Sequence, residues 1–275
     1  MSSSRALTTT RRGENSLALF AIALSLVTVA IGILIQPTTG WAGLLIAGYY
    51  GLSIAVGASL FAAINAVTGA TWFEPLFPVA ALISRTLIVP TGALVVTFLL
   101  GLHVLYPWAH DAAELSSQLM HEKAAWLNAP FFLARAGIVL LAFLGLTNSL
   151  FRQVPDYGRT RAPSRGMGAF FIVLFAGCIS IASWDWMMSL EPEWFSTMYG
   201  VYGFAGSFLG GIAAVAVLTI VLSTPKTGPN PRLRIGERQI HDLGSLMFGF
   251  AMFWAYIWFC QYMLIWYANL PEETP

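Results

Sequence analysis

Ionisable side chains interrupt several long apolar stretches of this sequence. Arg85, His103, Arg135 and Asp185 each lie within such a stretch, and the pair His241–Asp242 stands at the start of another. A charged group surrounded by hydrocarbon is costly, so residues of this kind mark buried ion pairs, proton paths or ligand sites. These positions are therefore the candidates for any chemistry that the chain performs.

Two kinds of chemistry fit His103, Arg135 and Asp185. Oxidation of a quinol releases phenolic protons, and a histidine with a carboxylate near the water interface could accept them. Alternatively, Arg135 and Asp185 form a buried ion pair that joins neighbouring helices, with His103 hydrogen-bonded nearby. Spacing alone favours the ion pair and leaves the quinol site open.

A second polar set comprises Glu74, Arg85, His241 and Asp242, near the opposite ends of the apolar stretches. Asp242 at the mouth of a helix could exchange protons with bulk water and begin a proton route. It could equally cap the N-terminus of that helix, for which Asp is a preferred residue. The two roles are compatible, and the sequence leaves both open.

Other chemistries lack the residues that they need. Bis-histidine haem ligation requires two imidazoles at one depth, and His103 is the one histidine inside an apolar stretch. A retinal Schiff base requires an intramembrane lysine, whereas Lys123 and Lys226 fall in connections. Cys178 and Cys260 form no CxxC pair for a metal, and a net charge of +1 provides no basic face for nucleic acid. We expect no metal site in this chain.

The apolar stretches have the length of transmembrane helices. The chain has 57% hydrophobic and 10% charged residues, against about 25% charged residues in soluble domains, so lipid must be its solvent. A helix needs about 20 apolar residues to cross a bilayer. Seven stretches qualify and predict an all-α polytopic membrane protein. They are Ser16–Gln36, Trp41–Gly69, Leu76–Tyr106, Pro130–Phe151, Gly168–Met188, Gly200–Ser223 and Leu243–Asn269.

Lysine and arginine are distributed unequally between the two sides of these spans. The N-terminal segment and the fourth and sixth connections carry three, four and four of them, eleven on one side, and the other side has only Lys123. Positively charged connections stay in the cytoplasm, so we expect a cytoplasmic N-terminus. This orientation places His103, Arg135 and Asp185 near the outer surface and Arg85 near the cytoplasm.

Three patterns predict how the spans are shaped and packed. Pro90 is expected to kink the third span. An aromatic ridge at Trp254, Trp258, Tyr262 and Trp266 is expected to serve packing or an interfacial belt. Small residues recur at four-residue spacing in the second and sixth spans and predict close helix contacts. They are Gly43, Ala47, Gly51, Ala55, Ser59 and Ala63, and Gly203, Ser207 and Gly211.

Several segments of the chain resemble a known family. They are GASLFAAINAVTGATW (Gly57–Trp72), GLHVLYPWAH (Gly101–His110), NAPFFLARA (Asn128–Ala136), SWDWMMSLEPEWFSTMYGVYGFAGSF (Ser183–Phe208) and HDLGSLMFGFAMFWAYIWFCQYMLIWYANLPEET (His241–Thr274). Together they are similar to the F subunit of bacterial alternative complex III, which is related to the NrfD/polysulfide-reductase membrane anchors. The similarity extends over nearly all the chain after the first span.

The resemblance implies a multi-pass subunit of a respiratory quinol:electron acceptor (cytochrome c) oxidoreductase in the bacterial inner membrane. The implied partners are a sister NrfD-like subunit, an iron–sulfur subunit, cytochrome c subunits and a terminal oxidase. Haem c and iron–sulfur clusters are expected on those partners, which leaves quinone as the one cofactor open for this chain. The implied role is scaffold and proton path. The alternatives are a quinol site built from His103 and Asp185 at the periplasmic side, and a secondary transporter.

The resemblance also divides the chain into regions. Residues 1–15 are a cytoplasmic segment, 16–36 a peripheral helix, 41–188 a first four-helix bundle, 200–269 half of a second bundle, and 270–275 a periplasmic end. Family members typically have about ten spans. The sequence is therefore expected either to be a truncated form or to have its second bundle completed by other subunits.

Overall fold

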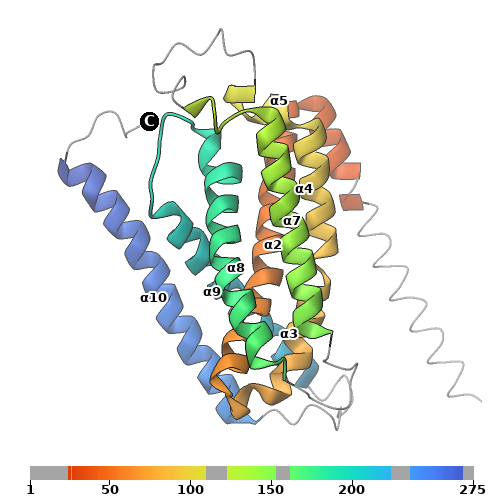
Figure 1. Ribbon diagram of the computed structural model, residues 1–275, viewed down its shortest axis with the longest axis vertical. Helices are drawn as coiled ribbons and strands as arrows, with labels where there is room; N and C mark the ends of the chain where they lie inside the picture. Colours follow the sequence, from red (N-terminus) through yellow and green to blue (C-terminus); the bar gives the residue numbers. More distant parts are fainter. Residues whose placement is uncertain (1–23, 26, 110–122, 153–161, 224–235, 269–275) are drawn as a thin grey trace, which may run out of the picture.

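The computed structural model describes residues 24–25, 27–109, 123–152, 162–223 and 236–268, and throughout these ranges the ordered elements are helices (Figure 1). Six of the described helical segments are long and apolar enough to cross a membrane, so the all-α polytopic fold is confirmed. Residues 24–25 and 27–35 are also helical and belong to the predicted first span, whose beginning lies outside the described residues. The six segments are Pro37–Thr68, Thr71–Leu100, Ala129–Phe151, Arg165–Leu190, Tyr199–Ser223 and Glu237–Ala268.

The helix α2 (Pro37–Thr68) begins four residues earlier than predicted. The predicted connection at residues 37–40 is instead its first turn, because proline suits the first helical position, where no backbone donor is needed. A Cβ atom on Gly40 would lie 2.6 Å from the nitrogen of Ile33, so glycine permits the tight turn from the preceding helix. At the other end, Gly69 has a φ of 69°, a left-handed conformation typical of glycine after a helix.

The third span is broken, as Pro90 predicts. It consists of η1 (Thr71–Leu76), α3 (Phe77–Arg85) and α4 (Ile88–Leu100), followed by the short α5 (Leu102–Leu105) and η2 (Pro107–Ala109). The ring of Pro90 would clash with the carbonyl of Thr86 in a continuous helix. The backbone therefore loosens at Thr86 and Leu87, whose N–H groups donate to carbonyls three residues back at 3.0 and 3.2 Å.

The remaining spans are α7 (Ala129–Phe151), α8 (Arg165–Ala182), α9 (Tyr199–Ser223) and α10 (Glu237–Ala268). Asn128 and Ser164 cap α7 and α8, because their side-chain oxygens accept hydrogen bonds from the backbone at 3.0 and 3.3 Å. The helix α8 continues through one π-helical turn, η4 (Ser183–Met187), and a 3₁₀ turn, η5 (Met188–Leu190).

The helix α2 lies at the centre of the bundle and packs against α3, α4, α8 and α9. Its closest contact is with α9, where a Cβ on Gly57 would lie 1.9 Å from the oxygen of Ser207 and one on Gly211 would lie 2.2 Å from the carbonyl carbon of Gly57. The predicted strip on the sixth span is confirmed here. The strip predicted on the second span packs on other elements, because Gly51 lies against Pro90 and a Cβ on Gly168 of α8 would lie 2.9 Å from the oxygen of Ala63. Gly57, which meets α9, lies off that strip.

The helix α10 is the least covered span. Its main contact is with α9. Within the most apolar part of the helix, 11% is buried, against 61% for the corresponding part of α2. Figure 1 shows it inclined along the edge of the bundle. Within the predicted aromatic ridge, Trp254 stacks on Tyr202 with ring centroids 5.2 Å apart, whereas Trp258, Tyr262 and Trp266 are exposed.

Candidate functional site

An ion pair joins α7 to the π-helical turn after α8. The Nε atom of Arg135 donates to Oδ2 of Asp185 at 2.6 Å, and the two residues are 7% and 1% exposed. Trp126, just before α7, donates from Nε1 to the other carboxylate oxygen at 2.9 Å, and its carbonyl accepts from Nη1 of Arg135 at 3.0 Å. The three residues form a polar cluster in which both carboxylate oxygens are occupied and Nη2 of Arg135 has no described hydrogen-bond partner. We call it the outer cluster, and the end of the bundle that carries it the outer end, after the orientation predicted from the charge distribution.

Aromatic rings cover the arginine of the outer cluster. The guanidinium carbon of Arg135 lies 4.1 Å from the ring centroid of Trp126 and 4.2 Å from that of Phe131. Contacts between a cation and aromatic faces offset part of the cost of removing the cation from water. The flat guanidinium thus contacts two rings that stand nearly perpendicular to each other, at an interplanar angle of 84°, while its Nε faces Asp185. Lysine could not reproduce this geometry.

The π-helical turn is held by side chains from other parts of the outer end. A π turn leaves carbonyl groups without their usual partners in the helix. Tyr106 donates to the carbonyl of Trp186 at 2.8 Å, Trp108 donates from Nε1 to that of Ser189 at 2.9 Å, and the hydroxyl of Ser189 donates to that of Asp185. These contacts fix the position of Asp185 from its C-terminal side.

His103 has its described hydrogen-bond contact within its own turn. It lies exposed in α5, and its Nδ1 atom is 3.0 Å from the carbonyl oxygen of Ala109. A carbonyl can only accept a hydrogen bond, so Nδ1 is the donor in this contact. The structure thus brings Arg135 and Asp185 together, whereas the hydrogen bond described for His103 is local to its own turn.

A small cavity of about 180 Å³ adjoins the outer cluster, lined by Lys123, Trp126, Asp185 and Trp194 among others. Lys123 donates to the carbonyl of Pro192 at 2.6 Å. Burial lowers the pKa of Lys123, and the nearby carboxylate of Glu193 opposes that shift. Lys123 and Trp126 were not predicted as site residues, because both lie in a connection. The only signal was an aromatic residue and a cation directly before an apolar span.

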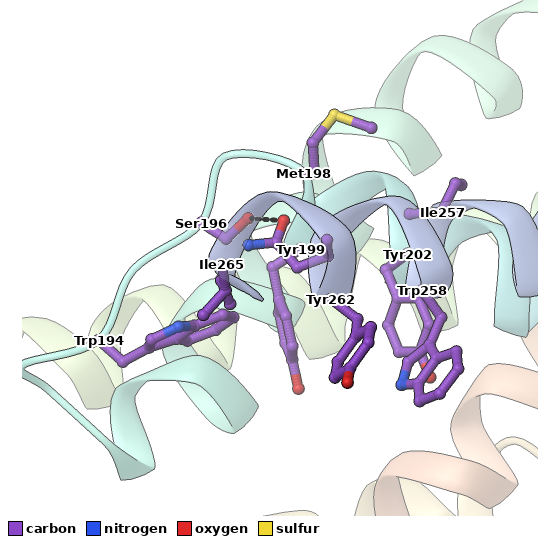
Figure 2. A pocket seen from close by; sticks show the side chains of 10 residues that line it. Trp194, Ser196, Met198, Tyr199, Tyr202, Ile257, Trp258, Tyr262 and Ile265 are labelled. Atoms are coloured by element: carbon purple, nitrogen blue, oxygen red, sulfur yellow. Dashed lines mark hydrogen bonds between the residues drawn. The ribbon is translucent and has the colours of Figure 1, made fainter. Parts of the chain in front are cut away.

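A second cavity, of about 280 Å³, lies between the chain before α9 and the outer half of α10 (Figure 2). Figure 2 shows Tyr199, Tyr262 and Trp258 projecting in the same direction along it. Its one described polar bridge runs from the Ser196 hydroxyl to Oε1 of Gln261, 3.1 Å away. Trp194 lines this cavity and the one beside Asp185, so the two are neighbours.

The residues of the predicted proton route lie on three elements at the opposite end. Glu74 is exposed in η1, Arg85 is exposed at the end of α3, and His241 and Asp242 lie in α10. Asp242 is half-buried. Figure 1 shows the start of α10 and α3 at the same end of the bundle. Their participation in proton transfer stays a prediction.

The prediction that Asp242 caps the last span is wrong. The helix α10 begins at Glu237, which places Asp242 in its second turn. The cause is the polar stretch before Leu243, which continues the helix beyond the apolar region because glutamate, arginine and glutamine favour helix formation. The backbone N–H of Gly236 donates instead to Oε1 of Gln239 at 2.9 Å, which satisfies a donor at the helix start.

No protein-family model matches this chain, and no curated protein matches it.

Proposed function

We propose that this chain is a membrane subunit of a respiratory quinol-oxidising complex of the alternative complex III type, and that it serves there as a scaffold. The observation that carries the scaffold role is the outer cluster. Asp185 accepts from Arg135 and Trp126 with both carboxylate oxygens, so both oxygens are already engaged within the chain. An ion pair that joins two spans and a connection fixes the outer end of the bundle.

The identity of the complex is supported by the resemblance of the five segments. We propose the bacterial inner membrane as its location, with the N-terminus in the cytoplasm, because of the eleven-to-one distribution of lysine and arginine. The proposed partners are a sister NrfD-like subunit, an iron–sulfur subunit and cytochrome c subunits, with a terminal oxidase downstream. In this proposal those partners carry the haem c groups and iron–sulfur clusters.

Purification of the complex from native membranes through a tag on this chain tests the proposal. We expect c-type haem absorbance and iron–sulfur signals to copurify with the chain in fixed proportion, together with quinol oxidation activity. A chain that purifies intact from gently solubilised membranes without haem or iron–sulfur partners would refute membership of such a complex.

A proton path is the second part of the proposed role. Asp242 supports it, because it is half-buried in α10 with the exposed His241 beside it, on the end where Glu74 and Arg85 also lie. A carboxylate in this position can reach bulk water and still be partly surrounded by the bundle. Proton uptake per electron in vesicles that contain the complex, compared between the native chain and Asp242→Asn, tests this role.

Quinol binding by this chain is the second candidate function. It is favoured by the two neighbouring cavities at Trp194, which adjoin Asp185 and are lined by aromatic rings. The cavity beside Asp185 measures about 180 Å³, less than the roughly 300 Å³ at which ligand pockets usually begin. The scaffold role therefore stands first. A secondary transporter, which would bind its substrate near the membrane midplane, has less support because the ionisable groups described lie towards the two ends.

A further inference from the structure

A polar cavity of about 560 Å³ lies at the end of the bundle opposite to the outer cluster. The break between α3 and α4 forms one wall, with Ser84 and Arg85, and the last turns of α7 form the other, with Thr147, Asn148 and Arg152. Among the described residues that line it, none is acidic. The cavity therefore combines two guanidinium groups with an amide and two hydroxyls.

The hydroxyl of Thr147 indicates that this cavity accommodates a polar ligand. Thr147 is 6% exposed, lines the cavity, and its Oγ1 atom has no hydrogen-bond partner among the described residues. Ser84, by contrast, already donates to the carbonyl of Ala80 at 2.7 Å and accepts from Ser59 at 2.8 Å. A buried hydroxyl without a partner costs free energy, which a ligand that bears acceptors would recover.

The chemistry of the lining selects an anion with several acceptor oxygens. Arginine provides only donors, and its planar fork matches the oxygens of a phosphate. The amide of Asn148 and the hydroxyl of Thr147 add donors on the α7 side. We propose that the cavity binds the phosphate of an anionic phospholipid headgroup.

Apolar residues beside the cavity favour a lipid over a free phosphate ion. Ile88 lines the cavity, and Ile88 and Val89 of α4 and Leu141 of α7 are large exposed hydrophobic residues. They continue from the cavity along the two helices towards the middle of the span, where acyl chains would lie. The cavity is also at the arginine-rich end, which by the charge distribution faces the anionic cytoplasmic leaflet.

Native mass spectrometry of the purified full chain tests the proposal. The chain is incubated in non-ionic detergent with phosphatidylglycerol or with phosphatidylcholine of the same acyl chains, and bound lipid is counted. We expect phosphatidylglycerol to be retained in clear preference. Arg85→Gln and Arg152→Gln should each weaken that retention about fivefold, as expected for one basic residue against an anionic headgroup. Thr147→Val, which removes only the buried hydroxyl, should weaken it severalfold.

Arg165→Gln is the matched control, because Arg165 is exposed at the same end and does not line the cavity. It should leave lipid retention unchanged. Equal retention of the two lipids would overturn the proposal. Equal losses of lipid retention in Arg165→Gln and Arg152→Gln would also overturn it, and so would unchanged retention in Thr147→Val. Either result would mean that the lipid is held by charges on the surface and not in the cavity. Complete displacement of the lipid by millimolar inorganic phosphate would refute the lipid as occupant and assign the cavity to a free ion. Circular dichroism confirms that each variant is folded.

Discussion

Replacing Asp185 with asparagine should destabilise the chain without removing the activity of the complexes that still assemble. Asparagine keeps the size of the side chain and can still accept from Trp126, but it leaves the buried Arg135 without a counter-charge. Breaking a buried pair by removing one partner costs about 3–5 kcal/mol. The rings of Trp126 and Phe131 contact the guanidinium in the native chain and in the variant alike, so they do not change this difference. The expected loss is thus on the order of 3–5 kcal/mol.

The assay compares the yield of assembled complex from native membranes and the thermal unfolding of the solubilised full chain. Glu191→Gln is the matched control, because it also removes one negative charge at the outer end, from an exposed position. The double variant Arg135→Met/Asp185→Leu should recover most of the loss, since an apolar pair of similar volume often replaces a buried ion pair without cost.

Two results would refute this reasoning. If Asp185→Asn unfolds at the same temperature as the native chain, the outer cluster does not stabilise the bundle. If the variant assembles in normal amount and loses quinol oxidation, Asp185 belongs to a quinol site and the scaffold interpretation of the outer cluster is wrong.

Three further predictions concern other parts of the chain. Gly57→Ala should destabilise the chain by about 1–3 kcal/mol, because the added methyl group would meet the carbonyl of Ser207. The control Gly43→Ala, whose methyl group would meet nothing within 4 Å, should leave the unfolding temperature unchanged. Reporter fusions within Thr160–Gly166 should behave as cytoplasmic and fusions after Pro275 as periplasmic; the opposite pattern at both sites would overturn the charge argument. Asp242→Asn should lower proton uptake per electron in vesicles at normal assembly, and unchanged coupling would end the proton role of Asp242.

Features that depend on local chemistry or on depth could be predicted from the sequence. Pro90 breaks its helix because of its own ring, whatever surrounds it. The pairing of Arg135 with Asp185 follows from their equal depth on consecutive spans, since a buried charge at one level requires a partner at the same level. The all-α fold follows in the same way from the length and composition of the apolar stretches.

Features that depend on the relative rotation of helices could not be predicted. The spacing of small residues on the second span indicates a smooth face but not which helix meets it, so the contact of Gly57 with α9 was missed. The predicted start of α10 was wrong because the apolar stretch marks only the part of the helix that lies in lipid. The helix itself begins earlier, at Glu237. Trp126 was missed because the feature that matters is its position in space beside Asp185, not its place in the sequence.

The π-helical turn at Ser183–Met187 makes the outer end sensitive to the number of residues in the chain as well as to their identity. A π turn holds one residue more than a regular helix accommodates. Deleting Trp184 would let the helix close into regular geometry and would largely keep the phase of the residues that follow. Deleting a residue from the regular part of α8 would instead rotate all that follows by about 100°, and would turn the carbonyls of Trp186 and Ser189 away from Tyr106 and Trp108. A scan by point substitution would leave this dependence unseen, whereas single-residue deletions and insertions along residues 179–190 would locate the phase of the helix directly.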